Sequence, residues 1–231
     1  MNGTPLPYLP VSDSWIMLLT LLFLLVSCHI LAYDHASLGA EIKKVFVPHH
    51  DNQGIPQATA SEMRHFLFLQ VQTAILAALL FVCYAWGIRP RPGTFYQNLL
   101  HFSIFAAIVF ACCTMRTLLY MLIGWIFFRK EQAASWMRCY FTTENIFSFC
   151  LLIIVLLCIY ADIEPQKCVI AGLIVLFLLK SLLFFKGIHL FSLSPISRLY
   201  FILYLCALEI IPIIFAVSGL YAANNTSSLN I

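Results

Sequence analysis

Residues 168–185 read CVIAGLIVLFLLKSLLFF, and Lys180 is the only charged side chain among them. A helix needs about 20 mostly apolar residues to cross the roughly 30 Å hydrocarbon core of a bilayer, so this stretch predicts a transmembrane helix. The whole chain has the same character: 62% of its 231 residues are hydrophobic and 10% are charged. Soluble domains carry about 25% charged residues. We therefore expect an integral membrane protein.

Six apolar stretches come near the length of a span, at about residues 15–33, 66–88, 99–128, 146–160, 168–185 and 199–221. None alternates polar and apolar side chains as barrel strands do, and a spanning backbone must satisfy its hydrogen bonds internally, so the spans are predicted to be helices. The prediction is an all-α, polytopic membrane protein with about six helices in one transmembrane domain, residues 1–231. The third stretch is longer than the bilayer is thick, which predicts tilt, protrusion or a break.

The loops between these spans differ in positive charge. The first, third and fifth loops hold eight Lys and Arg residues, and the second and fourth hold three. Cytoplasmic loops carry the excess of Lys and Arg in membrane proteins. The predicted topology therefore has the odd loops in the cytoplasm and both termini outside it.

Two of the loops are amphipathic. Residues 38–46 place apolar side chains near helical spacing opposite charged ones, which favours a short helix on the cytoplasmic leaflet; the alternative is a solvated loop. Residues 136–141 hold Trp136, Met137, Tyr140 and Phe141 after Arg129 and Lys130. This combination of aromatic and basic side chains predicts an interfacial anchor in the third loop.

Three ionisable residues lie inside predicted spans: Arg116, Lys180 and Glu209. A charge at the centre of a membrane helix costs roughly 2.5–3.5 kcal/mol on insertion scales, so such residues are candidates for function. The fifth and sixth spans are joined by a turn near Ser194-Pro195, and Lys180 and Glu209 are equally distant from it along the chain. They should therefore lie at one depth and form an ion pair, with Arg116 at a comparable depth.

This buried charge cluster has two interpretations. It could bind an anion or a proton, with Tyr204 as a hydrogen-bond partner and Pro212 kinking the helix beside Glu209. Alternatively it is a structural ion pair that fixes the register of the helices.

Other kinds of chemistry lack a signature in this sequence. There is no C-x-x-C, G-x-S-x-G or H-E-x-x-H motif and no glycine-rich phosphate loop. We expect no catalytic residues, no metal site and no cofactor. The net charge of +3, without a basic block, argues against nucleic acid as a partner.

The C-terminal segment Ser194-Pro195 followed by LYFILYLCALEIIP, residues 199–212, resembles the signature of a domain-of-unknown-function family of bacterial polytopic inner-membrane proteins. The resemblance implies a bacterial cytoplasmic membrane. It also implies a focus on Tyr204, Glu209 and Pro212, without giving them a role.

Three functions fit these observations. The first is the binding or passage of a small anionic or proton-linked solute at the buried cluster. The second is a non-catalytic scaffold in an envelope complex, with a membrane-protein partner or a second copy of the chain beside it in the bilayer. The third, an intramembrane enzyme acting on lipid, is disfavoured because no nucleophile is paired with a base.

Overall fold

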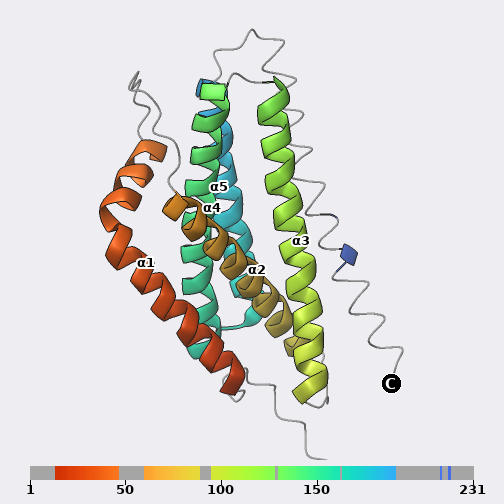
Figure 1. Cartoon of the computed structure of the whole chain (residues 1–231). Helices are drawn as coiled ribbons and strands as arrows, with labels where there is room; N and C mark the ends of the chain where they lie inside the picture. The colour runs from red at the N-terminus through yellow and green to blue at the C-terminus, as the bar shows by residue number, and fades with distance from the viewer. Residues whose placement is uncertain are drawn as a thin grey trace, which may run out of the picture.

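The computed structural model describes residues 14–46, 60–88, 95–127, 130–161, 163–190, 214 and 218–219. Within them the chain forms five long helices (Figure 1): α1 (Ser14–Phe46), α2 (Ala60–Ile88), α3 (Phe95–Phe127), α4 (Lys130–Tyr160) and α5 (Pro165–Leu190). The described residues contain no β-strand. The all-helical prediction is confirmed for this part of the chain.

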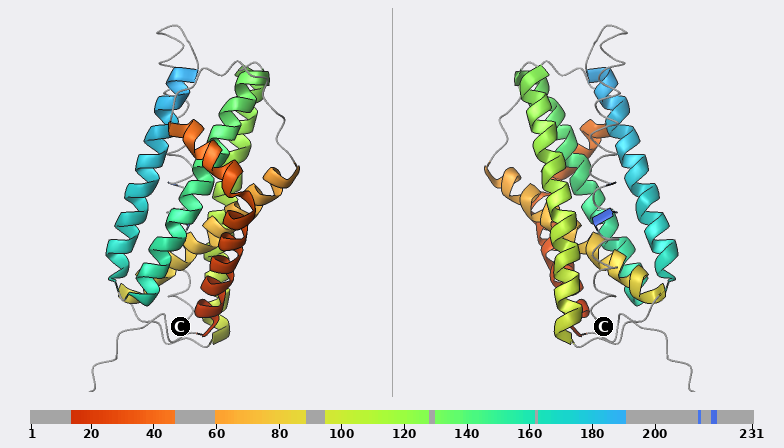
Figure 2. Two further views of the ribbon diagram at one scale, coloured as in Figure 1. Left: turned by 90° about the vertical axis from the view of Figure 1, so that its left-hand side faces the viewer. Right: turned by 90° about the vertical axis from the view of Figure 1, so that its right-hand side faces the viewer.

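Helix α4 is the centre of the bundle, because it contacts α1, α2, α3 and α5. Helix α2 crosses it at a steep angle, as Figure 2 shows, and also packs against α3 and α5. Polar bonds add to this apolar packing: Ser27 on α1 and Gln72 on α2 are hydrogen bonded at 3.0–3.1 Å, and Ser148 on α4 donates to the carbonyl of Leu69 on α2 at 3.2 Å. Such bonds between buried groups fix how the helices pack inside a membrane.

All five helices are long and apolar enough to cross a membrane. Their apolar windows differ in burial: 67% of the α2 window is buried inside the protein, against 22% for α3 and for α5. Large apolar side chains such as Phe177 and Leu118 are exposed on those two helices. In water such surfaces would be unfavourable, whereas a bilayer solvates them. The chain is therefore a multi-pass membrane protein.

The predicted spans differ from the helices in three places. Of the tilt, protrusion or break predicted for residues 99–128, the break does not occur in the described residues, since α3 is one continuous helix from Phe95 to Phe127. Residues 38–46 are helical, as their pattern predicts, but they continue α1. The fourth span, predicted at 146–160, belongs to a helix that begins at Lys130.

The interfacial anchor predicted in the third loop is therefore wrong. Trp136 and Tyr140 lie within α4 and are only 2% and 1% exposed. The charged residues between positions 129 and 145 gave this segment the appearance of a loop. In the structure the side chains of Trp136 and Tyr140 face the neighbouring helices. The ring of Tyr120 on α3 packs against both, with its centroid 6.3 Å from that of Trp136 and 4.8 Å from that of Tyr140.

The sixth predicted span, residues 199–221, lies mostly outside the described residues. Gly219 is described, and a Cβ atom added to it would lie 3.3 Å from the side chain of Ile108 on α3. Gly219 therefore lies close to Ile108 on α3. The count of six helices stays a prediction.

The topology is testable with a reporter that is active only outside the cytoplasm. Fused after Ile231, the reporter should be active, because the charge distribution predicts that the C-terminus lies outside the cytoplasm. The same reporter inserted between α3 and α4, next to Arg129, should be inactive. Reversed activities at normal expression would contradict the predicted orientation.

Candidate functional site

Glu144 on α4 bridges two cations from neighbouring helices. One carboxylate oxygen lies 2.8 Å from an Nη of Arg116 on α3, and the other accepts a hydrogen bond of 2.6 Å from Nζ of Lys180 on α5. The three side chains are 10%, 12% and 15% exposed for Arg116, Glu144 and Lys180. The charge cluster formed by these three residues therefore joins three membrane helices.

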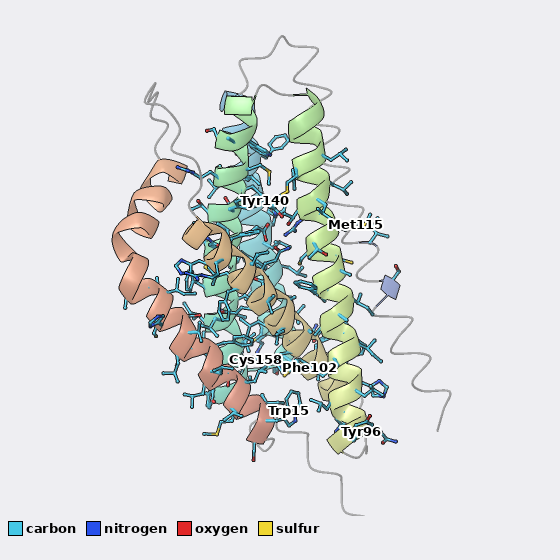
Figure 3. All side chains as sticks on the ribbon, viewed as in Figure 1. Trp15, Tyr96, Phe102, Met115, Tyr140 and Cys158 are labelled. Carbon is cyan, nitrogen blue, oxygen red and sulfur yellow. The ribbon has the colours of Figure 1, made fainter. Side chains whose placement is uncertain are left out.

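The helices place these side chains by their periodicity. Met115 is 45% exposed on the outer surface of α3 (Figure 3), so the next residue, Arg116, is rotated toward the bundle and is only 8% exposed. On α4, Tyr140 and Glu144 are four residues apart and therefore share a face. Lys180 faces them from α5, the helix that follows α4 in the chain.

Tyr140 contacts both cations of the charge cluster. Nε of Arg116 donates to the Tyr140 hydroxyl at 3.2 Å, and the Thr117 hydroxyl lies 3.2 Å from the same oxygen. The Tyr140 ring lies 5.1 Å from Nζ of Lys180 and 5.9 Å from the guanidinium carbon of Arg116, within the range of cation–π attraction. Gln70 on α2 extends the network by donating to Thr117 at 3.3 Å.

Two apolar layers enclose the charge cluster. Toward the α3–α4 connection lies a cluster of buried side chains: Tyr120, Trp136, Cys139, Tyr140 and Leu183. Toward the opposite end lies the main core, which includes Phe102 and Cys158 (Figure 3). The charges therefore occupy a medium of low polarity, in which electrostatic interactions are stronger than in water.

The cluster does not balance its charges. Two cations and one carboxylate leave one net positive charge among the described residues of the site. Charged side chains in membrane segments carry a large desolvation cost, which an opposite charge offsets. The carboxylate of Glu144 therefore offsets part of the cost of burying Arg116 and Lys180.

A small cavity adjoins the cluster between α2, α3 and α4. Its volume is about 10 Å³, enough for one group the size of a water molecule. Polar side chains form much of its wall: Gln70, Thr73, Arg116, Thr117, Tyr140, Glu144 and Asn145. Oδ1 of Asn145 is buried and has no hydrogen-bond partner among the described residues. The cavity wall therefore holds an ion pair, Arg116 with Glu144, and an amide oxygen that has no partner among the described residues.

This arrangement has the chemistry of ion binding. Across the described residues no group of three or more His, Cys, Asp or Glu side chains could hold a metal ion. The groups present can attract an anion, orient it by hydrogen bonds, and exchange it for the carboxylate of Glu144.

The structure brings together two of the three charges predicted from the sequence, Arg116 and Lys180. The third, Glu209, lies outside the described residues, as do Tyr204 and Pro212. The pairing of Lys180 with Glu209 therefore stays a prediction. In the described part of the chain, Lys180 has Glu144 as its carboxylate partner.

Sequence reasoning missed Glu144 because it assigned residues 129–145 to a loop. A usable signal was present. The α4–α5 connection is centred near position 162.5, so Glu144 and Lys180 lie 18.5 and 17.5 positions from it and are nearly level in antiparallel helices.

Comparison with known proteins identifies one family. The model of the family described as "Domain of unknown function (DUF4271)" matches residues 15–220, which include all three charged residues of the cluster. No curated protein and no solved structure matches the chain.

Proposed function

We propose that this chain, which belongs to the DUF4271 family, binds a small monovalent anion at the charge cluster and passes it across the membrane. The single observation that carries this proposal is the bridging of one buried carboxylate by two buried cations. Both cations are largely buried, so an anion that reaches them meets positive charge in a medium of low polarity, where the attraction is stronger than in water.

The position of the cluster supports passage as well as binding. Arg116, Glu144 and Lys180 lie 10 to 14 residues from the ends of their helices at the α3–α4 side, or about 15–21 Å at 1.5 Å per residue. An anion bound at this depth would lie inside the helix bundle, away from both ends of the helices. We place the protein in a bacterial inner membrane, on the basis of the resemblance of its C-terminal segment.

The proposal is tested by charge movement in liposomes. Purified protein is reconstituted, an inside-positive potential is applied, and its dissipation is followed with chloride, nitrate or hydrogencarbonate outside. We expect at least one of these anions to dissipate the potential faster than gluconate, which is too large for the site. Rates equal to those of protein-free liposomes for all three anions would contradict the proposal.

Lys167→Met is the matched control for this assay. It removes a cation from α5 that is paired with Glu164 at the surface, where both side chains are about 70% exposed. An exposed pair of this kind contributes little. The variant should therefore conduct like the wild type, while Lys180→Met should not.

The second candidate is a scaffold in which the charges only hold helices together. It is favoured by one observation: each oxygen of the Glu144 carboxylate already has a close cationic partner. A scaffold would retain its partner, or its second copy, in a variant whose three charges are replaced by methionine. A carrier would lose anion movement in that variant.

A further inference from the structure

Three buried cysteines meet where α2, α4 and α5 pack together, at a distance from the charge cluster. Cys83, Cys158 and Cys168 come one from each helix, belong to the same apolar core and are 2%, 5% and 4% exposed. The side chain of Cys158 interacts with those of both other cysteines, and its interaction with Cys83 is the stronger of the two. Cys158 is therefore the centre of a thiol cluster formed by these three residues.

The close approach of the three helices brings these thiols together. Helices α2, α4 and α5 are all in contact with one another. A Cβ atom added to Gly172 on α5 would lie 3.7 Å from the side chain of Leu80 on α2 and 3.8 Å from that of Leu151 on α4. Gly172, Leu80 and Leu151 each lie one or two helical turns from the cysteine of their own helix. The thiol cluster therefore continues this three-helix contact toward the ends of the helices.

The position of the thiol cluster favours oxidation. Cys158 is two residues from the end of α4, and Cys168 is three residues from the start of α5, so both lie within about 5 Å of the α4–α5 connection at 1.5 Å per residue. Figure 3 shows Cys158 in the half of the bundle next to this connection. The charge distribution predicts that the connection lies outside the cytoplasm, where disulfides form and persist.

We propose that Cys83 and Cys158 are a redox-active pair, and that they form a disulfide which ties α2 to α4. The interaction between these two side chains places them together before any bond is made, and local opening at the helix ends admits the oxidant. This inference is independent of the proposed anion site.

The oxidant is a small molecule or protein that contains a disulfide. The Cys158 thiolate attacks one sulfur of this disulfide, which gives a mixed disulfide and releases the first thiol. The Cys83 thiolate then attacks Sγ of Cys158, and the second thiol leaves. Two electrons pass from the two cysteines to the oxidant, whose two sulfurs take up the two protons.

The test is oxidation of the purified full-length protein in detergent with 4,4′-dipyridyl disulfide, a small apolar disulfide. The products are digested, and cross-linked peptides are identified by mass spectrometry. We expect a peptide pair joined through Cys83 and Cys158. The bond links residues far apart in the chain and restricts the unfolded state, so the melting temperature should rise by roughly 5–10 °C. Dithiothreitol should reverse both changes.

Cys158→Ala, treated in the same way, should show neither the cross-linked peptide nor the rise in melting temperature. Should this variant fail to fold, Cys83→Ala provides the same comparison. Cys150→Ala is the matched control, because it removes a thiol from α4 that is not part of the thiol cluster. It should retain both the bond and the rise.

Three results would overturn the inference. The first is the absence of the cross-linked peptide from wild-type protein whose exposed Cys28 has reacted with the oxidant. The second is a bond between Cys158 and Cys168 in its place. The third is a bond between Cys83 and Cys158 that leaves the melting temperature unchanged, because the bond would then not hold α2 against α4. The anion assay is read separately and fails or succeeds without reference to these thiols.

Discussion

Glu144→Gln should destabilise the protein more than any other single substitution in the charge cluster. The change leaves Arg116 and Lys180 buried, close together and without their shared carboxylate. Removal of one partner from a buried ion pair costs about 3–5 kcal/mol, since the remaining charge is no longer compensated. The expected result is a large fall in melting temperature in detergent, measured at matched protein and detergent concentrations.

The control is the triple variant Arg116→Met/Glu144→Met/Lys180→Met, which removes all three charges and keeps side chains of similar length. It should recover most of the lost stability, because apolar replacement of a whole buried ion cluster is often neutral or stabilising. Glu164→Gln, which breaks the exposed pair with Lys167, should change little. Similar losses in Glu144→Gln and in the triple variant would show that the three charges do not act as a unit.

Anion affinity should follow the net charge of the cluster. Arg116→Gln and Lys180→Met each remove one positive charge from the cluster and should weaken anion binding at least tenfold. One unit charge at about 4 Å contributes about 4 kcal/mol at an effective dielectric constant of about 20, before desolvation is subtracted. Glu144→Gln raises the net charge and should bind more tightly where it is folded. The measurement is the anion-dependent rise in melting temperature of each variant.

If the anion affinities of the variants do not follow the charge of the cluster, this prediction is contradicted. Weaker binding in Glu144→Gln than in the wild type, with the protein folded, would mean that Glu144 positions the anion or carries a proton with it. Equal binding in all variants would place the anion elsewhere in the molecule. Lys167→Met is again the control, with an affinity equal to that of the wild type.

The same experiments bear on Glu209, which the sequence pairs with Lys180. If that pairing exists, Glu209→Gln should destabilise the protein more than the double change Lys180→Met/Glu209→Met, since the single change leaves a buried cation without its partner. In the described residues Lys180 bonds to Glu144. Comparing Glu209→Gln with Glu144→Gln therefore shows which carboxylate Lys180 depends on.

Hydropathy predicted much of the fold, because a bilayer imposes a simple length rule on apolar helices. The five predicted stretches that begin near residues 15, 66, 99, 146 and 168 correspond to helices α1, α2, α3, α4 and α5. The fourth stretch covers only the second half of α4. The first half, which the prediction left in a loop, carries Arg138 and Glu144, and a hydropathy window cannot tell a charge that is compensated by neighbouring helices from one that faces water.

The candidate site was predictable only in part for the same reason. Arg116 and Lys180 interrupt long apolar runs, so their charges are conspicuous in the sequence. Glu144 follows two threonines and precedes Asn145, which reads as a polar loop. In the structure, however, Thr142 and Thr143 donate to the carbonyls of Arg138 and Cys139, four residues earlier, and thus satisfy their hydroxyls within the helix. The Asn145 acceptor could be found only with the helices placed around it.

The central claim is that one anion binds at the charge cluster. Titration calorimetry of the purified wild-type protein with hydrogencarbonate, alongside the triple methionine variant, tests it most directly. The account predicts one anion bound per wild-type chain and none in the folded triple variant. Equal binding by both proteins, or no binding by the wild type, would contradict it.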